Sequence, residues 1–259
     1  MIKVFIITDL EGISGISRAD QITQDSPDYA YSIGRLMADT NAAVAGAFDG
    51  GADEVLVVDG HGGGNNFPPD SLDPRAKQCR LSTKEVDFTT VSAFMHVGAH
   101  AMAGTLNAFL DHTQSSLRWF DYKVNGRSTG ELGQAGIFAG RFNIPYIFAA
   151  GDEAACVEAH QFFGDVVTAP VKYAVGRNTA VCLDNDEAVA LIRRRAAESI
   201  SRIGKIRPYR PTMPFDLEFT YTRADYCDAV CANRSDVNRI NARTIRRRQD
   251  TIVDYRDIM

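Results

Sequence analysis

The 259-residue sequence predicts an α/β fold in three layers, with a mostly parallel sheet and a smaller C-terminal α+β unit. Two observations indicate this class. Near-continuous apolar runs, as in residues 2–7 and 91–97, are typical of strands buried on both faces, and amphipathic helical patterns separate them. Around residues 201–214, three prolines and several basic residues mark the best candidate linker. We therefore expect an α/β domain over residues 1–200 and a small α+β domain over 201–259, which could include the strand near 118–128.

The first elements form a βαβ unit. After the strand at residues 2–7, Ser26-Pro27-Asp28 provides the cap and first turn of a long helix, and Gly50-Gly51 ends it. Residues 54–58 form the second strand. A strand, a crossover helix and a parallel strand connect with right-handed topology.

The remaining elements follow the same reasoning, except that residues 67–90 indicate only irregular surface or weak strand. Asn125-Gly126 predicts a tight turn after the strand at 121–124, and Asp184 caps an amphipathic helix that extends to Ile200. The other predicted strands are 91–97, 145–150, 166–168, 171–175, 217–222 and 244–248. The other predicted helices lie at 130–142, from 151 onward, and at 223–232.

Composition excludes several function classes. The formal net charge is −5, so no basic field exists to hold nucleic acid or an anionic membrane. No apolar run approaches the roughly 20 residues that a membrane span requires, and the N-terminus lacks the features of a signal peptide. The five cysteines are odd in number and mostly far apart, which favours free thiols. We expect a cytoplasmic protein with no nucleic-acid or membrane partner.

Polar residues gather where predicted strands end. Asp9 and Glu11 follow the first strand two residues apart, so on a continuing strand they point to the same side. His61 follows the second strand, and His100 follows the run at 91–97. Glu131 opens a helix, where it could also serve only the helix dipole. Because ligands bind beyond the carboxyl ends of strands in open α/β sheets, we expect these side chains to converge.

Two histidines and three carboxylates suit Zn²⁺, Mn²⁺ or similar ions. Five ligands exceed the need of one catalytic zinc and suit a metal pair about 3.5–4 Å apart, with Asp9 as the bridging carboxylate. Such a pair lowers the pKa of a bridging water, which gives a hydroxide nucleophile, and polarises a carbonyl. His112 is then the candidate catalytic residue outside the ligand set, moving a proton or stabilising an oxyanion.

Five segments together resemble the DppA-type D-aminopeptidases, a family of di-zinc metallopeptidases. They are Asp9-Leu10-Glu11-Gly12-Ile13-Ser14-Gly15, Asp59-Gly60-His61, Gly98-Ala99-His100-Ala101, His112-Thr113 and Gly130-Glu131-Leu132-Gly133. The resemblance runs in register to at least Asp152 and more loosely to the end. The loop from His100 to His112, which lines the substrate side, is one residue longer than in the type member. The family's metal binding is therefore a firmer expectation for this chain than its substrate specificity.

The resemblance implies the following site and activity. Two zinc ions, or other divalent ions, are bound by the residues Asp9, Glu11, His61, His100 and Glu131, and His112 is catalytic. The substrate is a short peptide with an N-terminal D-residue, cleaved by a metal-bound hydroxide. Family members form a ring-like homo-oligomer, a decamer in the type member.

Other interpretations of these residues stay open. The chain could hydrolyse another small amide with the same metals. The segment Asp9-Leu10-Glu11-Gly12 also resembles the nucleophile motif of haloacid-dehalogenase phosphatases, although that motif normally has Asp in place of Glu11. A non-catalytic protein could hold metal only for structure, but a structural zinc site is closed and often contains cysteines. We interpret His96 and His160 as structural.

Overall fold

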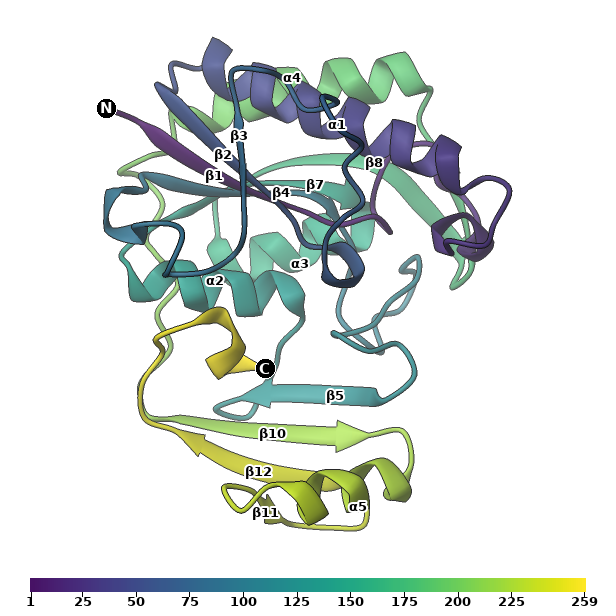
Figure 1. The fold of residues 1–259 in the computed structure, drawn as a ribbon, viewed down its shortest axis with the longest axis vertical. Coiled ribbons are helices and arrows are strands. Elements are labelled where there is room, and N and C mark those ends of the chain that lie inside the picture. Colours follow the sequence, from purple (N-terminus) through teal and green to yellow (C-terminus); the bar gives the residue numbers. More distant parts are fainter.

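The computed structural model describes all of residues 1–259 (Figure 1). Its main sheet has the strand order β3-β2-β1-β4-β7-β8-β9, and only the β8–β9 pair is antiparallel. These strands are β1 (Lys3–Thr8), β2 (Glu54–Asp59), β3 (Lys77–Cys79), β4 (Ala93–Ala99), β7 (Tyr146–Asp152), β8 (Val167–Gly176) and β9 (Thr179–Cys182). The central strands β1, β4 and β7 are almost completely buried, as their apolar sequences predict.

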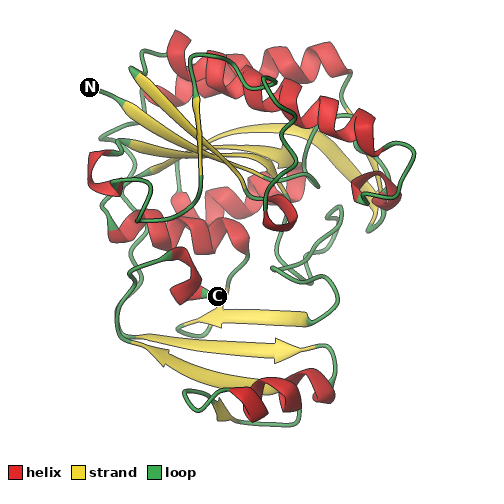
Figure 2. Ribbon diagram, viewed as in Figure 1, coloured by secondary structure: helices red, strands yellow, loops and turns green.

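Helices cover both faces of this sheet, which confirms the predicted three layers (Figures 1 and 2). Helices α1 (Tyr29–Asp49) and α4 (Asn185–Ile200) pack together on one face. Helices α2 (Glu131–Arg141) and α3 (Glu153–Phe163) pack together on the other. None of the helices is long and apolar enough to span a bilayer.

A second, antiparallel sheet lies below α2 and α3 in Figure 1, with α5 (Ala224–Asn233) on its far side. Its order is β11-β12-β10-β5-β6. The strands are β5 (Trp119–Val124), β6 (Arg127–Ser128), β10 (Phe215–Tyr221), β11 (Asn238–Arg239) and β12 (Thr244–Gln249). Strand β5, which lies within the region near 118–128, pairs with the C-terminal strand β10. The domain boundary at residue 200 stays a prediction.

Four short 3-10 helices complete the chain: η1 (Ala19–Ile22), η2 (His61–Gly63), η3 (Phe88–Thr90) and η4 (Tyr255–Ile258). Of these, η4 lies between α2 and the second sheet (Figure 1). The carbonyl of Ile258 accepts hydrogen bonds from Tyr122 Oη and, at 3.4 Å, from Gln134 Nε2, while Arg247 Nη2 donates to Asp257 O at 2.8 Å. The C-terminal residues thereby join the second sheet to the helical layer.

The structure corrects one prediction about the strands. The two strands expected at 166–168 and 171–175 form the single strand β8, which continues through Pro170. Proline is tolerated there because β9 pairs with β8 only from Lys172 onward, and a register shift in β7 falls opposite at Gly151 and Asp152. The edge strands β3 and β9 were not predicted as defined elements, since neither has an extended apolar run.

Beyond β1 the chain runs unusually close to the end of β4. Asp9 N donates to Val97 O at 2.8 Å, and Gly12 N donates to Gly98 O at 2.9 Å. A Cβ atom on Gly12 would lie 2.1 Å from the carbonyl oxygen of Ala99. Only glycine fits this position, because the obstructing atoms are backbone atoms on a buried strand end.

We predict that Gly12→Ala lowers the free energy of unfolding by about 1–3 kcal/mol, since the added methyl group displaces two backbones. The measurement is urea denaturation. Gly34→Ala is the matched control, because a Cβ at Gly34 in α1 would meet nothing within 4 Å. That substitution raises stability by about 0.5–1 kcal/mol through helix propensity. A Gly12→Ala protein as stable as the parent would contradict the close approach.

Candidate metal centre

The candidate site lies where the main sheet changes its winding direction. From β1 the chain crosses through α1 to β2 on one side, whereas β4 lies on the other side of β1 and leads on to β7. At such a switch point the connections diverge and leave a crevice beyond the strand ends. Asp9 follows β1 and His100 follows β4, so both side chains enter this crevice.

One half of the site is built around His61. Its Nδ1 atom lies 3.0 Å from Asp9 Oδ1 and 3.1 Å from Glu11 Oε2. Asp9 and Glu11 are both buried, and the backbone N–H of Leu10 donates to Asp9 Oδ1 at 2.8 Å. His61 begins η2, the first turn after β2. The predicted pair of carboxylates therefore faces the predicted histidine.

The other half is built around His100. Its Nδ1 lies 3.0 Å from the Ala101 carbonyl and donates to it, so in the neutral ring the lone pair is on Nε2. Nε2 lies 3.2 Å from Asp9 Oδ2 and 3.4 Å from Glu131 Oε1. This nitrogen is buried and lacks a hydrogen-bond partner. A buried unpartnered acceptor between two carboxylates is an arrangement that a cation would complete.

The electrostatics of the site depend on the close packing of its charges. Burial alone would raise the pKa of Asp9, but His100 and His61 hold it well below its usual value. Burial likewise opposes protonation of His61, yet the hydrogen bonds and charges of Asp9 and Glu11 raise its pKa to about 11. Positive charge is strongly favoured among these carboxylates, whether protons or metal ions provide it.

His112 joins the same cluster. Its ring stacks on that of His100 with centroids 4.0 Å apart and an interplanar angle of 10°. Nδ1 lies 2.8 Å from the Leu110 carbonyl and donates to it, so the lone pair is on Nε2, 3.7 Å from Glu131 Oε1. All six predicted site residues thus converge.

The donor atoms fit a metal ion. Ligand atoms of Asp9, Glu11 and His100 lie within 4.8 Å of one another, and so do those of His100, His112 and Glu131. Imidazole nitrogens and carboxylate oxygens are the ligands of catalytic zinc. The second group shows that His112 also lies within ligand range, so its role outside the ligand set stays a prediction.

The two histidines that we interpreted as structural lie apart from this cluster. His96, within β4, is buried with its Nδ1 2.9 Å from Tyr146 Oη, and burial lowers its pKa to about 4. His160, on α3, is exposed and contacts Gly164 O and Thr168 Oγ1. Neither forms a hydrogen bond or an ion pair with a candidate ligand.

Sequence reasoning missed Lys172, which is completely buried in β8. Its Nζ donates to Glu11 O at 2.6 Å and to Ile16 O at 2.7 Å, and it lies 4.8 Å from the ring centroid of Phe109. Lys172 therefore holds both ends of the loop that carries Glu11. The only indication in the sequence is that Lys172 is a single lysine within a strand whose buried side is otherwise mostly apolar.

Other missed residues support the centre in the same way. Buried Asp39 accepts hydrogen bonds from Ser14 N at 2.8 Å and Ser14 Oγ at 2.7 Å, which fixes the loop from α1. Gln114 N donates to Glu131 Oε1 at 2.7 Å. Glutamine and serine are too common in loops for the sequence alone to indicate these contacts.

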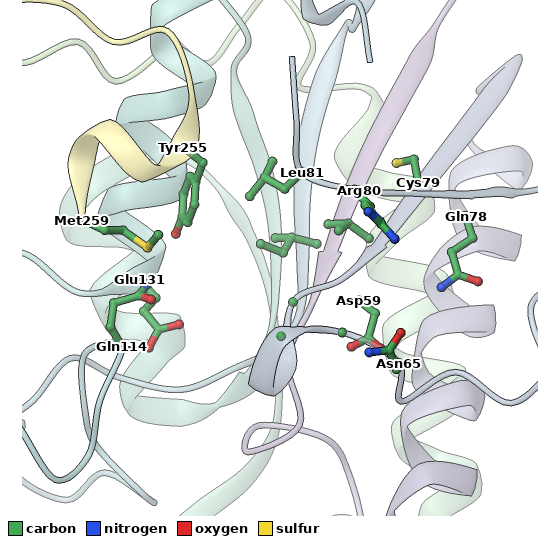
Figure 3. A pocket seen from close by; sticks show the side chains of 15 residues that line it. Asp59, Asn65, Gln78, Cys79, Arg80, Leu81, Gln114, Glu131, Tyr255 and Met259 are labelled. Carbon is green, nitrogen blue, oxygen red and sulfur yellow. Dashed lines mark hydrogen bonds between the residues drawn. The ribbon is translucent and has the colours of Figure 1, made fainter. Parts of the chain in front are cut away.

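A cavity of about 600 Å³ opens beside Glu131 (Figure 3). In this view Glu131, Gln114, Tyr255 and Met259 lie on one side, and the ends of β2 and β3 lie on the other. The cavity gives a small molecule access to the second half of the centre.

We predict that Lys172→Met lowers the free energy of unfolding by about 1–3 kcal/mol, because two buried carbonyls lose their donor. It also weakens zinc binding about 10-fold or more, because the loop that carries Glu11 is no longer held. Urea denaturation and competition with a zinc chelator measure the two effects. Lys77→Met on edge strand β3, where the side chain is 70% exposed, is the control and changes stability by less than about 0.5 kcal/mol. Unchanged zinc affinity in Lys172→Met would contradict the role of this lysine.

Comparisons with known proteins agree with this fold and site. The family model described as D-aminopeptidase matches residues 2–259. The D-aminopeptidase of Bacillus subtilis (strain 168) is 32% identical over 216 residues, which cover 81% of this chain and 77% of that protein. A solved structure, the Zn-dependent D-aminopeptidase DppA from Bacillus subtilis, a self-compartmentalizing protease, superposes with a TM-score of 0.93 at 24% identity, covering 99% of this chain and 95% of that one. The structural likeness establishes the shared fold, and the family match spans almost the whole sequence. The chain belongs to the D-aminopeptidase family.

Proposed function

We propose that this protein is a zinc aminopeptidase that removes N-terminal D-residues from short peptides. The observation that carries the proposal is the pair of histidine–carboxylate groups that share Asp9, one oxygen facing His61 and the other facing His100. Membership of the D-aminopeptidase family supports the reaction, and the zinc dependence of the Bacillus subtilis structure supports the metal.

We assign the ligands of two zinc ions per chain, or of other divalent ions, from the contacts of Asp9. Glu11 and His61 would hold one ion together with Asp9 Oδ1, whereas His100 and Glu131 would hold the other together with Asp9 Oδ2. Each set contains one imidazole and two carboxylates, which leaves positions open as a catalytic zinc requires. When bound, the metals polarise the scissile carbonyl and lower the pKa of a coordinated water.

The chain's own residues supply orientation and proton transfer. The hydrogen bond from His112 Nδ1 to Leu110 O leaves Nε2 as the reactive nitrogen, 3.7 Å from Glu131. From there His112 accepts a proton or, when protonated, stabilises negative charge on the substrate oxygen and protonates the leaving amine. Stacking on His100 fixes the ring plane. The carboxylates around the centre favour the free α-ammonium group of a substrate, which accounts for amino-terminal selectivity.

The alternatives receive less support. A haloacid-dehalogenase-type phosphatase requires Asp9 as a free nucleophile, yet both Asp9 carboxylate oxygens lie within 3.2 Å of histidine nitrogens. Hydrolysis of a different small amide would use the same centre, and family membership favours the aminopeptidase. A closed structural zinc site does not match ligands that line a cavity, as Glu131 does.

We further propose that the chain acts in the cytoplasm as a homo-oligomer, with a decamer as the expected assembly. The description of the Bacillus subtilis structure as self-compartmentalizing supports an enclosed assembly. Large apolar side chains that are exposed in the single chain, such as Leu117, Phe120 and Leu106, provide surfaces that association would bury.

The proposed function is tested by hydrolysis of matched D- and L-aminoacyl dipeptides by zinc-loaded protein. We predict release of the N-terminal residue from the D-series, with kcat/KM at least about 10-fold above the L-series, because a rigid pocket distinguishes mirror-image side chains. Asp9→Asn, which weakens both metal positions, abolishes the activity and reduces bound zinc from two ions per chain. Protein with two zinc ions per chain and no activity on any dipeptide would overturn the peptidase assignment.

For His112 we predict that substitution separates metal binding from catalysis. His112→Gln retains two zinc ions per chain and lowers kcat about 10²–10⁴-fold, the usual contribution of a general acid or base. Metal analysis and steady-state kinetics measure the two effects, and His160→Gln on the exposed face of α3 is the control. Loss of one zinc ion in His112→Gln would instead make His112 a ligand.

A further inference from the structure

The cavity beside the metal centre has an uneven charge distribution. Three charged side chains line it, and two of them, Asp59 and Glu131, are acidic. The third, Arg80, lies on the opposite side from Glu131 in Figure 3. A ligand that occupies the cavity therefore meets the Glu131 carboxylate on one side and the Arg80 guanidinium, which lies on the same side as Asp59, on the other.

The position of Arg80 follows from the topology of the main sheet. Strand β3 pairs in parallel with β2, with Cys79 opposite Val58, so Arg80 is the first residue beyond β3. It emerges at the carboxyl edge of the sheet, the same edge that carries Asp9, His61 and His100. The side chain therefore belongs to the ligand-binding edge rather than to a remote surface.

The guanidinium of Arg80 is available to a ligand. Its charged neighbour is Glu85, whose Oε1 lies 3.9 Å from Nε, beyond hydrogen-bond distance. The other oxygen of Glu85 accepts a hydrogen bond from the Arg80 backbone N–H at 3.1 Å. The Arg80 side chain is 87% exposed, so its terminal nitrogens face the cavity and solvent.

Asp59 does not compete for this guanidinium. Both of its carboxylate oxygens are engaged by Asn66, whose backbone N–H donates to Oδ2 at 2.5 Å and whose Nδ2 donates to Oδ1 at 2.9 Å. Asp59 thus orders the turn after β2. Arg80 remains the positive group of this cavity, and its one ion-pair contact, with Glu85, is long at 3.9 Å.

We propose that Arg80 binds the free α-carboxylate of the substrate, which makes di- and tripeptides with an unblocked C-terminus the preferred substrate class. This inference rests on the proposed peptidase function. The planar guanidinium of arginine pairs with a carboxylate through two parallel hydrogen bonds. A carboxamide is neutral and has only one acceptor oxygen, so it cannot form this pair.

The dimensions of the sheet agree with this substrate length. At the ends of the strands, Thr8 of β1 pairs with Asp59 of β2, one strand spacing away. On the other side of β2, Cys79 of β3 pairs with Val58, and Arg80 is the next residue. Two spacings place the Arg80 backbone about 10 Å from the end of β1, where Asp9 begins the metal centre. An extended dipeptide or tripeptide spans roughly 7–11 Å. The metal centre would hold the first residue with the scissile carbonyl, so the one or two residues after it, together with the extended Arg80 side chain, cover this distance, whereas a longer chain would extend past Arg80.

The test is binding of a dipeptide analogue in which a CH₂–NH group replaces the scissile amide, prepared as the acid and as the C-terminal amide. Calorimetry on zinc-loaded protein measures both dissociation constants without hydrolysis. We expect the parent protein to bind the acid about 10-fold or more tightly than the amide, and Arg80→Gln to reduce this preference to within about twofold. Lys84→Gln, an exposed residue of the same loop that does not line the cavity, removes the same charge and retains the preference.

Hydrolysis of D-alanyl-glycine and D-alanyl-glycinamide by the same three proteins provides the second measurement. We expect Arg80→Gln to raise KM for the acid about 10-fold while leaving the amide unchanged. A parent protein that binds acid and amide equally, or an Arg80→Gln protein that keeps the preference, would overturn the role of Arg80 even if peptides are cleaved. If the acid binds more tightly than the amide and this preference depends on Arg80, but no peptide is cleaved, then the carboxylate site stands and the peptidase function is rejected.

Discussion

Burial of negative charge at one point of the main sheet is the constraint on which the rest of this structure depends. Buried Asp9 and Glu11 and half-buried Glu131 converge beyond the ends of β1 and β4, and such a group of carboxylates is stable only with positive charge among them. The carboxylates raise the pKa values of both His61 and His100, against the effect of burial, which shows how strongly this point of the structure favours positive charge. Divalent cations would supply that charge between the same side chains, which is why the centre is preorganised for metal.

The surrounding fold holds these groups in place by contacts with the backbone. Gly12 allows the loop after β1 to touch the end of β4, and Lys172 and Asp39 hold that loop through the carbonyls of Glu11 and Ile16 and through Ser14. The tautomers of His100 and His112 are set by carbonyl acceptors from their own loop. Support of this kind orients the candidate ligands and fixes the tautomers of their histidines.

Much of this arrangement could be predicted from sequence because it follows from local patterns. Apolar runs indicated the central strands, and polar residues directly after those runs indicated Asp9, His61 and His100. Edge strands β3 and β9 were less visible, because each is short and half exposed. Lys172 and Arg80 could not be assigned, because their roles depend on distant pairing: Lys172 reaches Glu11 across 161 residues, and Arg80 reaches the cavity only through the β2–β3 register.

The central claim is that two metal ions share Asp9. Zinc-edge anomalous diffraction from crystals of zinc-loaded protein tests it most directly. The account predicts two anomalous peaks in each chain, one among Asp9, Glu11 and His61 and the other among Asp9, His100 and Glu131. A single peak, or two peaks that do not share Asp9, would contradict it.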